Sequence, residues 1–486
     1  MRTLAPSSRP APQGGDPGPA AGRGPRWAVL VLACLGQFLV ILDVSVMNVA
    51  IPPMRQDLGM SPSALQWVTI AYVIPFSGLM LLFGRLGDLW GQRTVFITGM
   101  ALFTLASLGG GLAQEPWQIL VARAAQGVGS AAVAPVTLTL VSTAFAEVEA
   151  RSRAIGTWAA VASAGGAAGS LVGGVLVEYL SWRSVLLINV PVGLLVLAGS
   201  LAWLPKVRPA GSAKLDVPGA VLVCTGLAAL TFGISRSETA GWQAAGTLLP
   251  LIAGVILLAL FVLVQARTAA PLMPLRLFAN RSLRATTVGI LPVGAMFVVM
   301  WFFLNLYAQN VLHYSPLQAG LSFLPHSLAI VLASKTSARL ARRAGRTMLI
   351  TGGLALAAAG SLWQYAALSA DGTYLTAFLL PGLVMSLGLG YAATALTSLT
   401  TDCVATEDTG AASGINNTAR QMGGALGLSI LSAVAASHTS HGATPGSPAQ
   451  LADGYALVFL ITACAFALTA AVMPAMLPSR TGETAR

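Results

Sequence analysis

Stretches of about twenty apolar residues alternate with short polar segments from Trp27 almost to the C-terminus. At a rise of about 1.5 Å per residue, twenty helical residues cross a hydrocarbon layer about 30 Å thick. In lipid, each backbone polar group must be satisfied within its own segment, so these stretches are predicted to be helices. The pattern predicts fourteen spans: 27–51, 66–86, 95–113, 117–141, 157–177, 184–204, 217–235, 247–266, 284–309, 317–337, 347–367, 374–398, 418–437 and 453–476.

Composition supports an all-α membrane protein. Hydrophobic residues make up 55% of the chain and charged residues 9%, whereas a soluble domain carries about 25% charged residues. The net charge of +11 could indicate a nucleic-acid partner, but the basic residues lie in short loops and form no patch with interleaved aromatics. We interpret them as topological signals and expect the partners to be the lipid bilayer and small molecules, with no nucleic acid.

The basic loops predict the orientation of the chain. Lysine and arginine concentrate in every second loop, and the alternate set contains only Arg55, Arg183 and Arg236. By the positive-inside rule, the basic set is cytoplasmic, which puts both termini inside. Residues 1–26, rich in Pro, Gly and Arg, are predicted to be a disordered cytoplasmic tail, and residues 477–486 a second tail. The excess of arginine over lysine, with abundant alanine and glycine, suggests a bacterial inner-membrane protein.

An internal repeat divides the chain. Ser61 and Pro62 recur as Ser315 and Pro316, and the Arg85, Leu86, Gly91 pattern recurs at Arg339, Leu340 and Gly345, both displaced by 254 positions (315 − 61 and 339 − 85). Glycines at 156, 165, 166 and 169 recur at 414, 423, 424 and 427, displaced by 258 (414 − 156). Duplication predicts a six-helix bundle at 27–204, inserted helices at 205–283 and a second bundle at 284–476, an arrangement that transporters use with substrate at the interface.

Two ionisable residues lie deep within predicted spans, where charge is costly and indicates function. Asp43 lies eight residues, roughly 12 Å, from the outer end of its span, and Arg123 lies six residues, roughly 9 Å, from the outer end of its own. Their shared depth permits an ion pair if the helices adjoin. Burial raises the pKa of a carboxyl group and a neighbouring guanidinium lowers it, so such a group can be poised to exchange a proton. The alternative is a static ion pair that only holds the two helices together.

Two further patterns could carry function. Gly165, Gly169 and Gly173 share one helix face, with Gly166 and Gly174 beside it, which favours close helix contact, either as ordinary packing or as a sliding seam between halves. Phe297, Trp301 and Asn305 recur at four-residue spacing and could line an adaptable substrate cavity, or face lipid. Arg420 and Glu178 are weaker candidates at span ends.

Nothing in the sequence indicates a catalytic or cofactor site. The cysteines at positions 34, 224, 403 and 464 have no metal-ligand spacing. No lysine follows a glycine, so the phosphate-binding GxxxxGK[ST] pattern is absent and no ATP is expected to be used. An enzyme that holds a metal through clustered acids is disfavoured, because Asp43 has no acidic neighbour along its helix.

Four stretches, in order, resemble motifs of the major facilitator superfamily and of its fourteen-helix drug:proton antiporter branch. LDVSVMNVAIP (42–52) is similar to LDxTVVNVALP, and GRLGDLWGQR (84–93) to the loop GxLaDrxGrk. RAAQGVG (123–129) is similar to RxxqGxg, and GGAAGSLVGG (165–174) to GxxxGPxxGG, with Ser170 where the family usually has proline. That departure puts the proline-induced bend of this helix in doubt.

The resemblance implies an alternating-access antiporter with roles for particular residues. Asp43 and Arg123 would serve proton coupling, and the glycine motif at 165, 169, 173 and 174 would support antiport. The loop residues Gly84, Asp88, Gly91 and Arg93 would form a conformational latch, in which Asp88 caps a helix N-terminus. No cofactor is implied, since the proton gradient drives transport, and a monomer is expected.

The sequence leaves the breadth of transport open. It favours proton-coupled export of drugs, antibiotics or other amphipathic small molecules, and a dedicated exporter of one metabolite or self-made antibiotic would use the same fold. A single membrane acid tilts the expected substrates slightly towards cationic or neutral compounds.

Overall fold

The computed structural model describes residues 25–145, 147–205, 215–268, 271–405, 408–440 and 447–477. These residues form helices throughout and no strand. The first group, which we call the N-terminal group, comprises α1 (Arg26–Leu58), α2 (Pro62–Trp90), α3 (Gln92–Gly111), α4 (Pro116–Ala144), α5 (Val148–Tyr179), α6 (Trp182–Leu187) and α7 (Asn189–Trp203). Apart from residues 25, 26 and 477, the two predicted tails lie outside the described residues.

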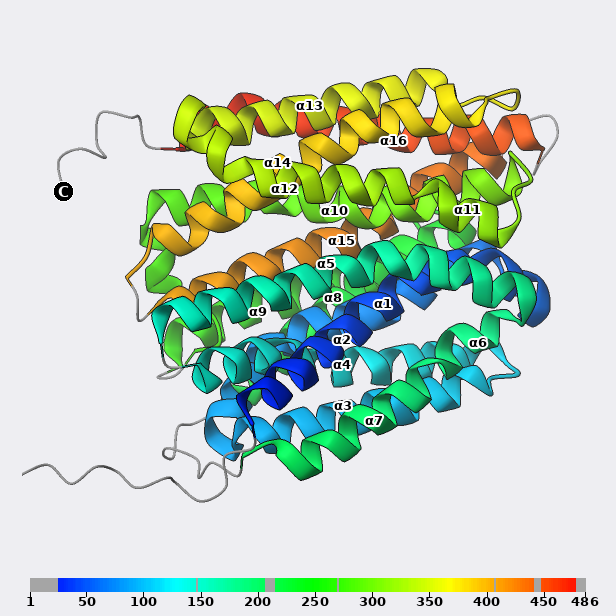
Figure 1. Cartoon of the computed structure of the whole chain (residues 1–486). Coiled ribbons are helices and arrows are strands. Elements are labelled where there is room, and N and C mark those ends of the chain that lie inside the picture. Colours follow the sequence, from blue (N-terminus) through cyan, green and yellow to red (C-terminus); the bar gives the residue numbers. More distant parts are fainter. Residues whose placement is uncertain are drawn as a thin grey trace, which may run out of the picture.

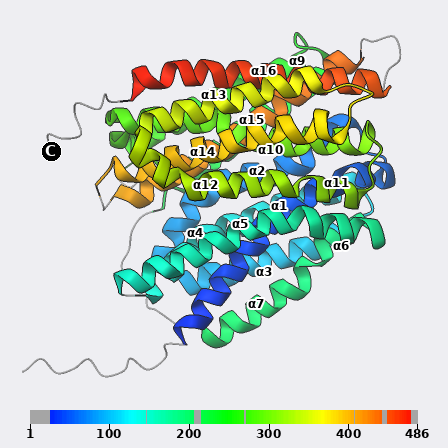
Figure 2. The same ribbon diagram turned by 45° about the horizontal axis from the view of Figure 1, so that its top comes forward.

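The second group, the C-terminal group, follows two intervening helices, α8 (Val217–Ala240) and α9 (Ala245–Arg267), and the short η1 (Leu275–Ala279). It comprises α10 (Arg281–Asn310), α11 (Pro316–Ser322), α12 (Leu324–Ala344), α13 (Arg346–Ala367), η2 (Tyr374–Leu379), α14 (Leu380–Asp402), α15 (Thr409–Ser440) and α16 (Pro448–Met476). The two groups lie side by side with their helices roughly aligned (Figures 1 and 2).

Helix packing within the two groups follows the same scheme. α1 packs on α5 as α10 packs on α15, and α3 packs on α4 as α13 packs on α14. The repeated sequence positions also have matching local structure. Ser61 and Ser315 each cap a helix through the side-chain oxygen, followed by a proline in the first turn. Gly91 and Gly345 join consecutive helices at φ 89° and 90°, a backbone conformation that a side chain disfavours.

The intervening helices pack against the seam between the groups. α8 contacts α9, α2 of the N-terminal group and α15 of the C-terminal group. Its Ser235 hydroxyl accepts hydrogen bonds from Gln66 (3.1 Å) and Trp67 (3.2 Å) of α2. Arg276 of η1 donates twice to Asp408 just before α15, at 2.8 and 2.6 Å. These bonds from Arg276 hold the pKa of the Asp408 carboxyl below its ordinary value.

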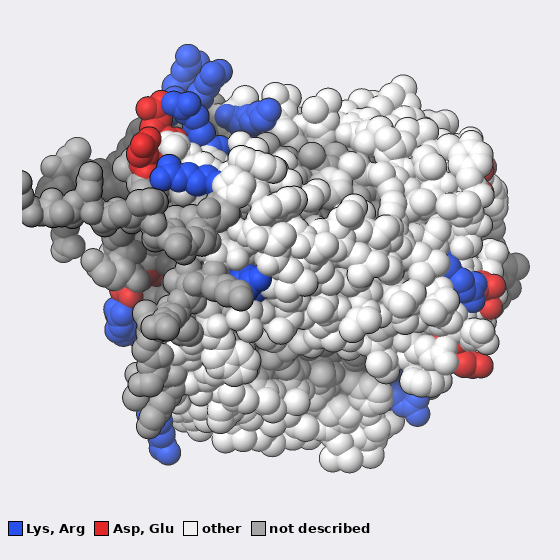
Figure 3. Space-filling model, turned by 60° about the horizontal axis from the view of Figure 1, so that its bottom comes forward, with Lys and Arg blue, Asp and Glu red and all other residues white. Residues whose placement is uncertain are grey.

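Eleven helical segments in the described part of the chain are long and apolar enough to cross a membrane. The remaining predicted spans correspond to α5, α13 and α15, which run beside those segments (Figures 1 and 2). Charged side chains gather at the two ends of the aligned helices, and the broad middle of the face in Figure 3 is nearly free of them. That distribution suits a surface whose middle faces hydrocarbon.

Several predicted span boundaries need correction. α1 continues through Pro52 and Pro53 to Leu58, α5 begins at Val148 instead of residue 157, and α15 begins at Thr409 instead of 418. The predictions followed the ends of the apolar runs, but a helix continues into polar sequence wherever its backbone bonds can form. The sixth predicted span is broken between α6 and α7. Pro191 causes this break, because it has no N–H to donate to the carbonyl of Leu187.

We predict that Gly345→Ala lowers the melting temperature of the purified protein. The glycine has φ 90° and ψ 152°, a region where a side chain costs about 1–3 kcal/mol. The matched control is Gly352→Ala in α13, where an added Cβ meets nothing within 4 Å and φ is ordinary. The control should melt at or above the temperature of the unmodified protein, and equal losses in both variants would show that backbone strain at Gly345 is not the cause.

Candidate functional site

The site is built around a fully buried ion pair between α1 and α4. The Arg123 Nη1 donates to Asp43 Oδ2 at 2.5 Å, and the two side chains are 1% and 0% exposed. The guanidinium also donates through Nε to the Val68 carbonyl at 3.0 Å and lies 4.4 Å from the centre of the Tyr72 ring, both on α2. The pairing expected from the shared depth of the two residues is therefore present, with a third helix holding the arginine in place.

Neutral side chains complete the surroundings of Asp43. Its Oδ1 accepts hydrogen bonds from Gln126 Nε2 at 3.0 Å and from Asn189 Nδ2 at 2.8 Å. Gln126 also donates to the Ser107 hydroxyl at 2.7 Å and accepts from Arg123 at 2.9 Å. We call these five residues the Asp43 network; they come from α1, α3, α4 and α7.

The sequence interpretation missed three members of this network: Ser107, Gln126 and Asn189. All are neutral, so a search for ionisable groups in apolar spans passes over them. The available signal was an amide side chain inside an apolar run, which must find partners when buried. Gln126 lies within the quoted RAAQGVG stretch, and Asn189 precedes Pro191 by two residues in the sixth span.

The glycine motif faces two different partners. A Cβ at Gly165, Gly169 or Gly173 would crowd α1; at Gly173 it would lie 3.1 Å from Val46 Cα. The three-glycine face therefore packs inside the N-terminal group, beside the helix that carries Asp43. Contact with the C-terminal group falls to Gly174, where a Cβ would lie 2.8 Å from Leu317 Cα of α11. Of the two alternatives left open by the spacing, the three glycines therefore fit packing within one group, and the contact between the groups lies on the neighbouring face.

Ser170, which replaces the motif proline, is buried on the same side of α5 as Gly174, and its carbonyl faces Gly320 of α11. α5 forms one unbroken helix from Val148 to Tyr179. The Ser170 hydroxyl has no hydrogen-bond partner among the described residues.

The predicted latch residues lie around the junction of α2 and α3. Gly91 joins the two helices, and Gly84 backs onto Pro135 of α4, 3.9 Å from the position of an added Cβ. Arg93 donates to the Leu201 carbonyl at 2.7 Å and to the Ser200 carbonyl at 3.5 Å, at the end of α7, where cations interact favourably with exposed carbonyls. The Asp88 side chain lies outside the described residues.

The predicted cavity residues separate into three environments along one face of α10. Trp301 is 7% exposed and stacks on Phe323 at 4.5 Å between ring centroids. Asn305 is 1% exposed and donates to the Asn48 carbonyl of α1 at 2.6 Å. Phe297 keeps 38% of its surface exposed. The three side chains do not share one set of contacts.

Of the two weaker candidates, Arg420 lies elsewhere than expected, whereas Glu178 is exposed at the end of α5, as expected. Because α15 begins at Thr409, Arg420 lies eleven residues, about 16 Å, inside the helix and not at its end. It donates to Asn417 at 2.9 Å, and no carboxylate of the described residues forms an ion pair with it. Glu178 accepts from the Leu317 backbone at 3.5 Å across the seam between α5 and α11.

Comparisons with known proteins agree with this architecture. Residues 33–428 match the model of the Major Facilitator Superfamily. The chain is 46% identical over 459 residues to the cephamycin export protein CmcT of Amycolatopsis lactamdurans, covering 94% of this chain and 93% of that one. It is 39% identical over 476 residues to the puromycin resistance protein pur8 of Streptomyces alboniger, covering 95% and 94%. A bacterial homologue of the human lysosomal transporter Spinster, solved in an inward-facing conformation, matches with a TM-score of 0.65 at 16% identity, covering 94% of this chain and 99% of that one.

The chain belongs to the Major Facilitator Superfamily. It is a multi-pass membrane transporter of the bacterial branch of that superfamily and not an enzyme, and its relatives include antibiotic export and resistance proteins.

We predict that the Asp43–Arg123 pair is energetically coupled. Arg123→Gln removes the charge that compensates a buried carboxylate, and breaking one side of a buried pair costs about 3–5 kcal/mol. Arg123→Gln should therefore lower the melting temperature at pH 8 more than the double variant Asp43→Asn/Arg123→Gln does. Losses that simply add would show that the two side chains do not stabilise one another.

Proposed function

We propose that this protein is a proton-coupled exporter of antibiotics or similar amphipathic compounds from the bacterial cytoplasm, working by alternating access. The observation that carries the proposal is the Asp43–Arg123 pair, 2.5 Å apart and fully buried. A carboxylate that loses its pairing when protonated links proton binding to a change in helix contacts. Transport then exchanges a proton for substrate at the interface of the N-terminal and C-terminal groups, within one chain acting as a monomer.

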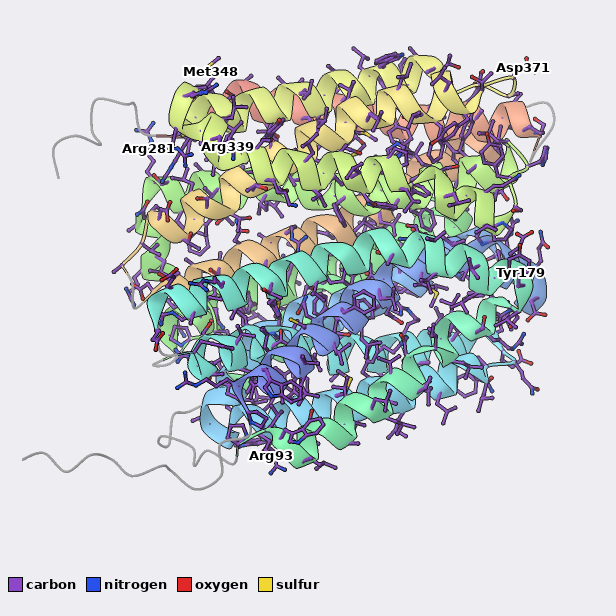
Figure 4. All side chains as sticks on the ribbon, viewed as in Figure 1. Arg93, Tyr179, Arg281, Arg339, Met348 and Asp371 are labelled. Atoms are coloured by element: carbon purple, nitrogen blue, oxygen red, sulfur yellow. The ribbon has the colours of Figure 1, made fainter. Side chains whose placement is uncertain are left out.

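The proposal includes fourteen membrane crossings with both termini in the cytoplasm. α1 begins and α16 ends at the same end of the molecule (Figure 1). Arg93, Arg281 and Arg339 lie at this end, whereas Tyr179 and Asp371 lie at the opposite end (Figure 4). We call them the basic end and the outer end. The positive-inside rule assigns the basic end to the cytoplasm.

The contacts between the groups support closure of the outer end, and α2 and α15 also pack together nearer the basic end. Towards the outer end, Asn305 of α10 bonds the Asn48 carbonyl, Gln309 bonds the Val49 carbonyl at 3.2 Å, and Gly174 lies against α11. α5 and α12 approach each other near the outer end and diverge towards the basic end in both ribbon views (Figures 1 and 2). The solved relative in an inward-facing conformation has the same overall fold.

Other predicted residues take supporting roles in this proposal. Phe297, which keeps 38% of its surface exposed, shares a helix face with Asn305, which contacts α1, and we assign it to the substrate path. The glycine face of α5 lets α1 approach closely, and the loop from Gly84 to Arg93 acts as the cytoplasmic latch. Arg123 pairs with Asp43, and Arg420 forms no ion pair among the described residues, so the tilt towards cationic or neutral substrates stays a prediction.

We predict that Asp43→Asn abolishes proton-driven efflux while the protein still reaches the membrane. The amide keeps the size of the side chain but cannot exchange a proton. Uptake of substrate into everted vesicles, driven by an imposed pH gradient, measures the effect; a matched variant, Asp57→Asn at the outer end of α1, should retain most of the activity. Undiminished gradient-driven uptake by Asp43→Asn would remove the coupling assignment.

We also predict that Gly174→Leu prevents closure of the outer end, because no side chain fits between α5 and α11. Spin labels on Tyr179→Cys and Asp371→Cys, both exposed at the outer end, should report a longer distance in this variant. Gly156→Leu provides the control, since a Cβ there meets nothing within 4 Å on the same helix. The same distance in Gly174→Leu as in the control would contradict the assigned closure.

A dedicated exporter of one compound is the second candidate. The names of the two relatives at 46% and 39% identity each refer to one antibiotic, whereas a relative named as a multidrug resistance protein is 32% identical. A susceptibility panel in an efflux-deficient host separates the candidates, with acidic, neutral and cationic antibiotics included. Protection against one compound supports the dedicated exporter, and protection across charge classes supports broad export.

A further inference from the structure

The donors around Asp43 leave few acceptors for the O–H that the carboxyl group carries once it has bound a proton, as the proposed function requires. The carboxylate accepts hydrogen bonds from Arg123, Gln126 and Asn189. In each of these contacts the partner is the donor and a carboxylate oxygen is the acceptor. A protonated carboxyl group, by contrast, has an O–H that must find an acceptor when it is buried.

Most acceptors close to Asp43 are already used. The Gln126 Oε1 accepts from Arg123 at 2.9 Å. The Ser107 hydroxyl accepts from Gln126 at 2.7 Å and from Asn189 at 3.4 Å, and it donates to the Phe103 carbonyl at 2.8 Å. An arginine offers no acceptor at all. Within the described part of this network, the free acceptor is the Asn189 Oδ1, which is buried and has no hydrogen-bond partner.

We propose that Asn189 is a positioning residue that serves both protonation states of Asp43. Its Nδ2 donates to the carboxylate at 2.8 Å, and a half-turn of the side-chain amide presents Oδ1 to the O–H of the protonated acid. The proton stays on Asp43, and no bond other than hydrogen bonds forms or breaks at Asn189. This inference rests on the proposed function, because it assumes that Asp43 takes up and releases a proton.

The fold suits this role for Asn189. The residue is the first of α7, directly after the break that separates α6 from α7, and it is 0% exposed. Its amide contacts Oδ1 of Asp43, whereas Arg123 contacts Oδ2, so a turn of the amide leaves the bond between Asp43 and Arg123 in place. A side chain that both donates and accepts is needed at this place; leucine of similar size supplies neither function.

Few other groups can influence the titration. Arg123 and Tyr72 are the titratable neighbours from α4 and α2, and α3 and α7 contribute the neutral Ser107 and Asn189. The ionisable residues of α5 and α6 nearest this level, Glu178 and Arg183, belong to the outer end, where Arg183 pairs with Asp57. α10 and α11 carry no acidic or basic residue between 285 and 322 other than His313, in the loop that joins them.

Infrared difference spectra between low and high pH test the inference on the full-length protein. The carbonyl band of the protonated Asp43 is identified by its loss in Asp43→Asn. We expect this band to shift to higher frequency in Asn189→Leu, because the O–H of the acid loses its acceptor. In Asn189→Thr the band should return towards the frequency of the unmodified protein, because the threonine hydroxyl both donates and accepts. Gradient-driven efflux should fall about tenfold or more in Asn189→Leu, as expected for one hydrogen bond to a charged group, and recover in part in Asn189→Thr.

Gln126→Leu is the matched control. It removes one donor to Asp43, and the acceptor that it removes serves Arg123, so the Asn189 Oδ1 stays in place and the upward shift of the band should be smaller than in Asn189→Leu. An unchanged band frequency in Asn189→Leu would overturn the inference and leave the proposed function standing. The absence of any Asp43-dependent band in the unmodified protein at every pH would instead overturn the coupling role of Asp43, and the role of Asn189 with it.

Discussion

The other features of this structure depend on one buried ion pair, in which the Asp43 carboxylate and the Arg123 guanidinium lie 2.5 Å apart without access to water. Each ion taken from water into a low-dielectric interior costs several kcal/mol, and their attraction compensates only when geometry and additional hydrogen bonds are favourable. Here Val68 of α2 and Asn189 of α7 supply such bonds from two further helices, and Gln126 supplies them from α4 itself. The pair thereby ties α1, α2, α4 and α7 together, and a change of charge at Asp43 affects all of them.

The remaining features of the N-terminal group make this arrangement possible. Glycines on one face of α5 let that helix lie directly against α1, which brings the backbone around Asp43 close to the seam between the groups. On the other side, Asn305 and Gln309 of α10 bond carbonyls of α1 only five and six residues beyond Asp43. The same helix thus carries the acid and part of the outer closure. Protonation of Asp43 therefore takes place within two helical turns of the contacts between α1 and α10, which the proposed alternating access requires to open.

Much of this could be predicted from the sequence, and the limits have physical causes. The length of the apolar runs predicted the helices, and the depth of Asp43 and Arg123 in their spans predicted their pairing. Helix ends such as Thr409 could not be predicted, because hydropathy identifies the residues within the hydrocarbon layer and not the residue at which backbone hydrogen bonding stops. Arg420 was therefore placed at the start of its helix instead of inside it. Neutral partners such as Asn189 were missed because the search relied on the high free-energy cost of burying a charged side chain, which neutral side chains do not have. The spacing of the glycines in α5 left open whether they pack within one group or form the seam between the groups, since spacing identifies a glycine stripe but not the helix beside it.

The central claim is that Asp43 exchanges a proton for substrate. Its most direct test is the pH change on adding a transported antibiotic to the purified protein in weakly buffered detergent solution. The account predicts that the unmodified protein releases protons in proportion to the substrate bound and that Asp43→Asn binds substrate without releasing any. Equal proton release by the two proteins would contradict it.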